Sequence, residues 1–276
     1  MKIIDGKALA TSIRADLKAK IEKSEKKPGL AVVIVGEDPA SRIYVRNKIK
    51  ACGELGIRSY AYELPSNASQ KDVEALLDQL AIDKDVDGIL LQLPLPKHLD
   101  TDAITAHIPF EKDVDGFSAK NLGLLMQKKQ LVSACTPSGV MKILENEGVD
   151  LTGKHAVVIG RSETVGKPMA MLLLNANATV TMCHSKTKNL AQICSQADIL
   201  ISAVGKAGFV TDEMVKEDAV VIDVGINRDE NGKLCGDVDF ENVKEKASCI
   251  TPVPGGVGPM TITMLMYNTY LIASKE

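Results

Sequence analysis

The sequence predicts an α/β protein of two domains, in which buried parallel strands alternate with helices. Short apolar runs such as Leu30–Val35 and Ala156–Ile159 end at glycine, as strands covered on both faces often do. Segments with helical spacing separate these runs, which implies mostly parallel sheets with helices on both sides. A glycine loop joins the second run to a helix, as in Rossmann-like folds. We therefore expect an N-terminal three-layer α/β domain and a Rossmann-like, doubly wound parallel-sheet nucleotide domain.

The first half of the chain reads as one β-α-β-α-β run that follows an N-terminal helix. Apolar residues at helical spacing predict that first helix over Gly6–Lys27, before Pro28 and Gly29 end it. Asp38 is placed to cap a second helix that begins near Pro39. The elements expected after the first helix are strand Leu30–Val35, helix Ala40–Leu55, strand Ile57–Leu64, helix Gln70–Ile82 and strand Gly88–Leu93.

The second half repeats the alternation of strands and helices. A helix from Thr136 leads to a linker at Leu151–Lys154, where we place the domain boundary. The segment from Thr261 onward is apolar and helical, and we expect it to return to the first domain. The predicted limits are 1–150, completed by 260–276, for the first domain and 151–259 for the nucleotide domain; strands are expected at 156–159, 178–183, 198–204 and 219–224.

A glycine loop between a strand and a helix predicts an anion site. Gly160 ends the strand, Gly166 follows, and Pro168 suits a first helical turn because that turn leaves its N–H groups unpaired. Free N–H groups and the positive end of the helix dipole favour a dinucleotide pyrophosphate. The spacing GRSETVG differs from the usual GxGxxG, and two glycines alone more often mark only a tight turn.

The end of the following strand indicates which dinucleotide binds. NAD enzymes usually place a carboxylate there for the ribose 2′-hydroxyl, whereas this chain has His184, Ser185 and Lys186. Together with Arg161 in the first loop, a cation and a hydroxyl suit a 2′-phosphate, so NADP is favoured over NAD. Glu163, in the same loop, is a negative charge that weighs against this choice.

Four polar residues of the first half form a candidate catalytic group. Tyr44 and Lys48 are four residues apart on one predicted helix, Gln92 lies at the end of an apolar strand, and Asp115 lies in a turn. Alone, each has an ordinary interpretation as a surface lysine, a core tyrosine, a backbone-binding amide or a turn residue. The predicted fold brings them to one sheet edge, where open α/β sheets bind ligands.

Composition narrows the class of protein. The 276 residues carry a net charge of −3, and aromatic residues make up 3%, which argues against a nucleic-acid surface. The six cysteines form no CxxC pair and are expected to be reduced thiols of a soluble cytoplasmic protein. The N-terminus lacks a signal-peptide core, and no apolar run approaches membrane-spanning length. The histidines lack metal-ligand spacing, and no GxSxG motif is present.

Taken together, these motifs closely resemble the bifunctional methylenetetrahydrofolate dehydrogenase/methenyltetrahydrofolate cyclohydrolase family. The resemblance spans most of the chain in the family's order. It implies a folate cleft between two domains, a C-terminal helix that crosses back, and a homodimer. The matching stretches are SRIYVRNKIKACGELGI (41–57), DGILLQLPLP (87–96), EKDVDGF (111–117), CTPSGV (135–140), GRSETVGKP (160–168), ATVTMCHSKT (178–187), DVGIN (223–227) and TPVPGGVGPMT (251–261).

The resemblance also implies activities and residue roles. The chain would oxidise 5,10-methylenetetrahydrofolate with NADP and hydrolyse the methenyl product to 10-formyltetrahydrofolate, within one-carbon folate metabolism. Lys48 would transfer protons in the hydrolysis, and Gln92 would hold Lys48 or the folate. The implied catalytic and substrate-binding residues are Tyr44, Lys48, Gln92, Asp115, Pro254, Gly255 and Gly256; the implied cofactor-binding residues are Gly160, Arg161, Ser162, Gly166, Ser185 and Ile226.

Two other functions remain open at this point. An NADP-dependent dehydrogenase of another small substrate, of the shikimate or amino-acid type, would explain the second half equally well. It would give no joint role to Gln92 and Asp115. A non-catalytic module that senses nucleotides is the other alternative, and an intact Lys48 argues against it.

Overall fold

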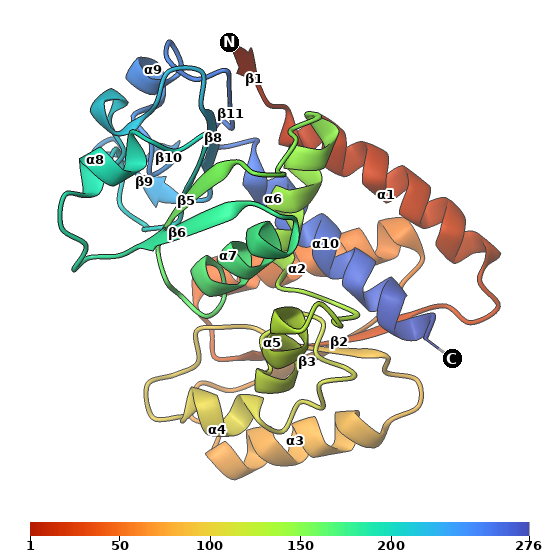
Figure 1. The fold of residues 1–276 in the computed structure, drawn as a ribbon. Helices are drawn as coiled ribbons and strands as arrows, with labels where there is room; N and C mark the ends of the chain where they lie inside the picture. The colour runs from red at the N-terminus through yellow and green to blue at the C-terminus, as the bar shows by residue number, and fades with distance from the viewer. Residues whose placement is uncertain (276) are drawn as a thin grey trace. The chain divides into compact units, whose positions relative to one another are not determined.

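The structure is a computed structural model that describes residues 1–275, and it divides into two compact units. Unit 1 consists of Met1–Ser12 and Ala134–Met264, and unit 2 consists of Ile13–Ser133 and the chain from Leu265 onward. The division falls inside helices α1 (Gly6–Lys23) and α10 (Val257–Ala273), which are labelled in Figure 1. Each of these helices therefore supplies residues to both units. The predicted limits of the two domains, 1–150 and 151–259, stay a prediction.

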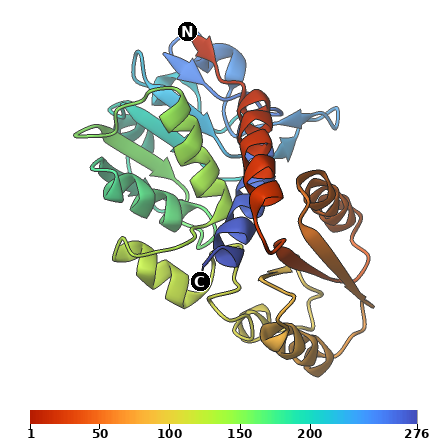
Figure 2. The same cartoon turned by 90° about the vertical axis from the view of Figure 1, so that its right-hand side faces the viewer.

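Unit 2 contains a parallel sheet between two layers of helices. Its strand order is β3-β2-β4, and both pairings are parallel. Helix α2 lies on one face and α3 on the other, as Figures 1 and 2 both show. This arrangement confirms the predicted three layers. The bounds are β2 Gly29–Val35, α2 Pro39–Leu55, β3 Arg58–Leu64, α3 Gln70–Ile82, β4 Gly88–Leu91, α4 Thr101–Thr105 and α5 Ala119–Met126.

The two faces of β2 explain why this sheet is fully covered. Alternate residues Ala31, Val33 and Val35 join a buried cluster with Val73 and Leu77 of α3. All seven residues of β2 are buried, as expected for the central strand of a sheet covered on both sides. The backbone N–H of Gln92 donates to the carbonyl of Val33 at 2.8 Å, which fixes the first residue after β4 at the carboxyl edge of the sheet.

Unit 1 contains a six-stranded sheet with the order β1-β11-β8-β7-β5-β6, and all five pairings are parallel. Helix α7 packs on β5 and β6, whereas α8, η1 and α9 contribute to a core on the other face. The doubly wound prediction is thus confirmed. The bounds are β1 Lys2–Ile3, α6 Cys135–Asn146, β5 His155–Ile159, α7 Gly166–Asn175, β6 Thr179–Cys183, α8 Leu190–Cys194, β7 Ile199–Ser202, η1 Asp212–Met214, β8 Val220–Asp223, β9 Asn227–Arg228, β10 Leu234–Cys235, α9 Phe240–Val243 and β11 Cys249–Ile250.

Several predicted boundaries are wrong by a few residues. Helix α1 ends at Lys23 rather than Lys27, because the Lys27 ammonium group turns back and donates to two carbonyls of the last turn, at 2.6 and 3.1 Å. Strand β4 ends at Leu91 rather than Leu93, before a cis peptide bond at Leu93–Pro94. The prediction also missed the short strands β1 and β11 and helix α5. Within residues 1–275, no helix combines the length and apolar character that crossing a membrane requires.

Candidate active site

Helix α2 presents Tyr44 and Lys48 on a face turned away from the core. The Asp38 carboxylate accepts a hydrogen bond from the N–H of Ser41 at 2.7 Å, with proline in the first turn, which confirms the predicted cap. Val45 and Cys52 are buried against the sheet, whereas the Tyr44 side chain is 43% exposed and Lys48 is partly exposed. The cap and the buried face therefore set the direction in which the lysine points.

Gln92 joins Lys48 to the end of β4. The amide nitrogen of Gln92 donates to the carbonyl of Leu93 at 2.6 Å, and this bond leaves the amide oxygen directed at Lys48. The Lys48 ammonium nitrogen lies 3.0 Å from that oxygen. An ammonium group has three donors, and within the described chain no carboxylate forms an ion pair with Lys48. Lys48 thus has one fixed neutral partner and donors left for a ligand.

Two aspartates of the turn before α5 have contrasting environments. The buried carboxylate of Asp113 accepts from the N–H groups of Gly116 (2.9 Å) and Ser118 (2.7 Å) and from the Asn121 amide (3.0 Å). Among residues 1–275, no group donates a hydrogen bond to Asp115. Burial raises the pKa of Asp115 to about 6, while the positive charge of Lys48 acts in the opposite direction. Unit 2 thus brings together three predicted residues, Lys48, Gln92 and Asp115.

The glycine loop of unit 1 is fixed by close backbone contacts. Gly160 has φ +125°, and a Cβ at this position would lie 2.4 Å from the carbonyl oxygen of Ala203. A Cβ on Gly166 would lie 2.3 Å from the carbonyl oxygen of Gly160. Only glycine fits both positions, so strand β5, the loop and helix α7 approach as closely as a nucleotide-binding turn requires. The residues present therefore fit a bound dinucleotide.

The expectation that the N–H groups of this loop are free is wrong in part. The Ser162 hydroxyl oxygen accepts from the N–H groups of Val165 (3.2 Å) and Gly166 (3.3 Å), and the N–H of Lys167 donates to the Ser162 carbonyl at 2.9 Å. A serine side chain thus occupies donors that we expected to face an anion. A phosphate could bind these donors only after the Ser162 hydroxyl turns away.

The other predicted cofactor residues follow strands at the carboxyl edge of the same sheet. Arg161 and Ser185 are exposed, and they follow β5 and β6, which are neighbours. In the part of the chain that the structure describes, Arg161 forms no hydrogen bond or ion pair. Ile226 follows β8, and this residue is 53% exposed.

The loop after β11 holds the predicted substrate-binding glycines. Gly255 has φ +110°, and its carbonyl accepts from the N–H of Lys7 at 3.1 Å. A Cβ on Gly256 would lie 2.6 Å from the carbonyl oxygen of Pro252. Glycine is therefore required at both positions, whereas Pro254 between these contacts is exposed.

Sequence reasoning missed Asp223 and Asp237, two buried carboxylates beside these loops. A signal was present, because Asp223 lies two residues before a glycine in DVG and Asp237 directly follows a glycine in GDVD.

Comparison with protein families and curated proteins gives matches over nearly the whole chain. A family described as "Tetrahydrofolate dehydrogenase/cyclohydrolase, catalytic domain" matches residues 4–115, and "Tetrahydrofolate dehydrogenase/cyclohydrolase, NAD(P)-binding domain" matches residues 134–276. The "Bifunctional protein FolD" of Nitrosospira multiformis is 55% identical over 99% of this chain and 96% of its own. That of a Streptococcus thermophilus strain is 54% identical over 99% of this chain and 98% of its own.

Solved structures agree with these matches. The bifunctional FolD methylenetetrahydrofolate dehydrogenase/cyclohydrolase of Campylobacter jejuni is 50% identical with a TM-score of 0.96, over 99% of this chain and 98% of that one. The Trypanosoma brucei enzyme, solved with NADP cofactor and inhibitor, is 39% identical with a TM-score of 0.92, over 98% and 96%. Shikimate 5-dehydrogenase of Thermus thermophilus is 14% identical with a TM-score of 0.52, over 87% and 99%, and shares only the fold.

Proposed function

Because the chain belongs to the tetrahydrofolate dehydrogenase/cyclohydrolase family, we propose that it catalyses two consecutive reactions on a folate. It oxidises 5,10-methylenetetrahydrofolate to the methenyl cation with NADP, and it hydrolyses that cation to 10-formyltetrahydrofolate. The 3.0 Å contact between the Lys48 ammonium nitrogen and the Gln92 amide oxygen carries this proposal, because it holds a proton-transfer group in a defined place. A dehydrogenase for shikimate or an amino acid is not favoured, since it gives this pair no function.

The oxidation needs little from the protein beyond binding and orientation. NADP, when bound, supplies the hydride acceptor. Gly160 and Gly166 allow the backbone to approach the diphosphate, and Ser162 would turn its hydroxyl toward it. The exposed side chain of Ile226 is proposed to cover the nucleotide with an apolar surface. No protein base is required, because a nitrogen lone pair of the folate helps to expel the hydride.

The hydrolysis needs a group that first accepts and later donates a proton. Lys48 is proposed for this role: in its neutral amine form the nitrogen would accept a proton from the water that attacks the methenyl carbon, and one N–H would still donate to Gln92. Gln92 positions Lys48 through the amide oxygen, and its own amide nitrogen is held by the Leu93 carbonyl. The neighbouring Asp115 has no donor of its own in the described chain and is proposed to accept hydrogen bonds from the amino and ring N–H groups of the pterin.

Two further parts of the chain are proposed to contact the folate. Tyr44 lies one helical turn before Lys48 with its side chain 43% exposed, so its ring is available to pack against the folate rings. For Pro254, Gly255 and Gly256 we propose contacts through the backbone. The glycines leave no side chain between the loop and a ligand.

The choice of NADP over NAD depends on Arg161 and Ser185. Arg161 forms no ion pair among the described residues, and a guanidinium group beside a hydroxyl binds a 2′-phosphate well. Glu163 is already paired with Lys167 at 2.8 Å, so its negative charge is partly compensated. NADP is therefore proposed as the physiological nucleotide.

Two properties of the whole protein complete the proposal. The resemblance to the family favours a homodimer, which sedimentation of the purified chain would reveal as twice the monomer mass. The six cysteines are all unpaired, which favours the reducing cytoplasm as the place where the protein works.

One spectrophotometric assay tests the proposed function. Purified protein is mixed with tetrahydrofolate, formaldehyde and NADP⁺, and the reduced nucleotide is followed; added methenyltetrahydrofolate is followed separately. The proposal requires both reactions, with NADP⁺ used better than NAD⁺. Reduction that occurs with shikimate but not with the folate would replace the proposal with the alternative dehydrogenase.

A further inference from the structure

A buried carboxylate in unit 1 organises the loop that follows β7. The side chain of Asp237 is completely buried, and both carboxylate oxygens accept hydrogen bonds. Three donors are consecutive backbone N–H groups, of Val204 (2.7 Å), Gly205 (3.3 Å) and Lys206 (2.9 Å). The other donors are the Ser202 hydroxyl at 3.2 Å and the Asn227 amide at 2.9 Å.

A second carboxylate holds Asp237 in place. Asp223, at the end of β8, accepts from the N–H groups of Gly225, Asp237 and Val238, each at 2.9 Å. The fit leaves no spare room, because a Cβ on Gly225 would lie 2.1 Å from an oxygen of Asp237, and a Cβ on Gly236 would lie 1.8 Å from an oxygen of Asp223. Burial raises the pKa of Asp223 to about 6. Burying two carboxyl groups costs free energy, so we expect this pair to have a function besides filling space in the core.

The contacts of Asp237 determine which backbone groups the loop offers to a ligand. In a trans peptide the N–H and the preceding carbonyl point in opposite directions. Because the N–H groups of Gly205 and Lys206 are directed at Asp237, the carbonyls of Val204 and Gly205 are directed away from it. Within residues 1–275 neither carbonyl accepts a hydrogen bond. The peptide units from Val204 to Lys206 therefore present carbonyl acceptors, and not N–H donors, on their outer side.

This loop lies where the strand order of the sheet reverses. The chain goes from β5 outward to β6 and then back to β7 on the other side of β5, and ligands of such sheets bind outside the carboxyl ends at that point. The Ala203 carbonyl lies against Gly160, only 2.4 Å from where a Cβ would be. If the adenosine half of NADP lies beside β6 and the diphosphate at Gly160, the nicotinamide half reaches the loop after β7.

We propose that Asp237 is a positioning residue for the nicotinamide half of the nucleotide, which it serves by fixing the carbonyls of Val204 and Gly205 as acceptors. These two carbonyls would accept hydrogen bonds from the carboxamide N–H₂ group and the ribose hydroxyls of that half. This inference rests on the proposed function, since it presupposes a pyridine nucleotide in unit 1.

The test compares Asp237→Asn with Asp239→Asn, a control two residues further on and partly exposed. Calorimetry measures the affinity for NADP⁺ and for 2′,5′-ADP, which lacks the nicotinamide half. For Asp237→Asn we expect NADP⁺ affinity to fall about tenfold or more while 2′,5′-ADP affinity stays within about twofold. We expect the dehydrogenase kcat of this variant to fall as well, while its rate of methenyl hydrolysis stays within about twofold of the wild-type rate. In the control Asp239→Asn, both affinities, the kcat and the hydrolysis rate should equal the wild-type values.

An equal loss of affinity for both ligands, or unchanged NADP⁺ affinity, overturns the inference. If Asp237→Asn does not fold, Ser202→Ala removes one donor to Asp237 without adding volume; about a threefold loss confined to NADP⁺ is then expected, and no loss overturns the inference. Both affinities are measured without folate. A wild-type protein that binds NADP⁺ but oxidises no folate therefore contradicts the proposed function separately.

Discussion

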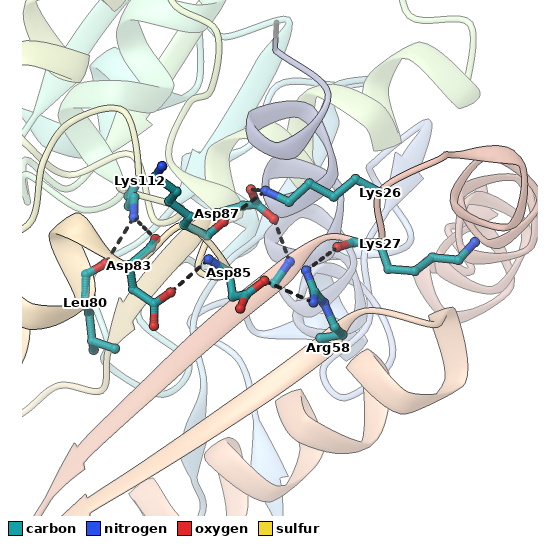
Figure 3. A network of polar contacts seen from close by, with 10 residues as sticks. Lys26, Lys27, Arg58, Leu80, Asp83, Asp85, Asp87 and Lys112 are labelled. Atoms are coloured by element: carbon teal, nitrogen blue, oxygen red, sulfur yellow. Dashed lines mark hydrogen bonds and ion pairs between the residues drawn. The ribbon is translucent and has the colours of Figure 1, made fainter.

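The two ends of the sheet in unit 2 carry similar residue types with opposite degrees of hydrogen bonding. At the amino ends of the strands, the Asp87 carboxylate binds the Lys26 ammonium at 2.5 Å and the N–H of Gly29 at 2.8 Å. Lys112 donates to two carbonyls near the end of α3, at 3.0 and 2.6 Å, and burial lowers its pKa (Figure 3). Each of these charged groups has at least two hydrogen-bond partners in the protein, mostly backbone groups.

At the carboxyl ends the polar groups are incomplete. Lys48 has one neutral partner, Gln92, and among the described residues Asp115 has no hydrogen-bond donor. Both side chains are only partly buried, so a ligand can reach them and can bring the donors and acceptors that the protein does not supply. The comparison therefore distinguishes charged groups that stabilise the fold from charged groups that are available to bind a substrate.

Replacing Lys48, at the carboxyl ends of the strands, is expected to give the largest loss of activity. For Lys48→Met we expect methenyl hydrolysis to fall at least about a hundredfold, the lower range of acid–base catalysis, because no other group is placed to transfer the proton. The rate of methenyl disappearance measures this. Lys50→Met, on an exposed lysine of the same helix, is the matched control and should keep the wild-type rate. Retained hydrolysis in Lys48→Met would remove this lysine from the mechanism.

Arg161 extends the comparison to the carboxyl edge of the other sheet, where it too lacks a partner in the described chain. Arg161→Ala should raise the KM for NADP⁺ about tenfold or more, the loss of one charge-assisted hydrogen bond, with little change for NAD⁺. Steady-state kinetics with both nucleotides measure the ratio. An equal increase for NAD⁺ would contradict binding of the 2′-phosphate by this residue.

The two aspartates of one turn should respond to the same substitution with opposite signs. Asp113→Asn leaves backbone donors without a full acceptor and should lower the free energy of unfolding by about 2 kcal/mol at pH 7.5. Asp115→Asn should raise it, by up to about 2 kcal/mol after allowance for the exposed part of the carboxyl. Urea unfolding of both variants measures the difference. Destabilisation by both would show that Asp115 is paired in the fold.

The same carboxyl predicts a pH dependence. The pKa of Asp115 is about 6 in the folded protein against an ordinary 3.8, so between these values the folded chain binds more protons than the unfolded one. Stability contributed by this group therefore falls as the pH rises from about 4 to about 6, and the loss is complete above that. Unfolding of Asp115→Asn should lack this part of the slope. An identical slope in wild type and variant would contradict the raised pKa.

The smallest effect is expected at the amino ends. Lys26→Met should lower stability by about 1 kcal/mol or less, because the Lys26 side chain is half exposed, and it should leave both activities unchanged. Thermal unfolding and the two assays measure this. A loss of activity comparable to that of Lys48→Met would mean that the number of hydrogen-bond partners does not distinguish the amino ends of the strands from their carboxyl ends.

The layers of the fold could be predicted because the pattern of apolar and polar residues indicates which segments are buried. The apolar run at Leu30–Val35 and the cap at Asp38 each have a local cause, and the structure has both. The end of α1 could not be predicted, since it depends on where the Lys27 side chain turns. Two-residue strands such as β11 are defined by pairing with distant β1 and β8, which no local pattern reveals.

The site was predictable in part for the same reason. Lys48 and Gln92 meet because strand order and helix phase place them there, and the sequence predicts both. The different environments of Asp113 and Asp115 could not be read from EKDVDGF, because each depends on which way the turn folds. The sequence also did not reveal that the Ser162 hydroxyl accepts from the N–H groups of Val165 and Gly166; its predicted role in cofactor binding stays a prediction.

Binding of tetrahydrofolate to the wild-type protein and to Asp115→Asn, measured by calorimetry at pH 7.5, tests most directly whether the incomplete hydrogen bonding serves a ligand. If pterin N–H groups supply the donors that Asp115 lacks, the variant should bind at least about tenfold more weakly although its fold is more stable. Equal affinity of the two proteins would contradict this account, since Asp115 would then be unpaired without a substrate that needs it.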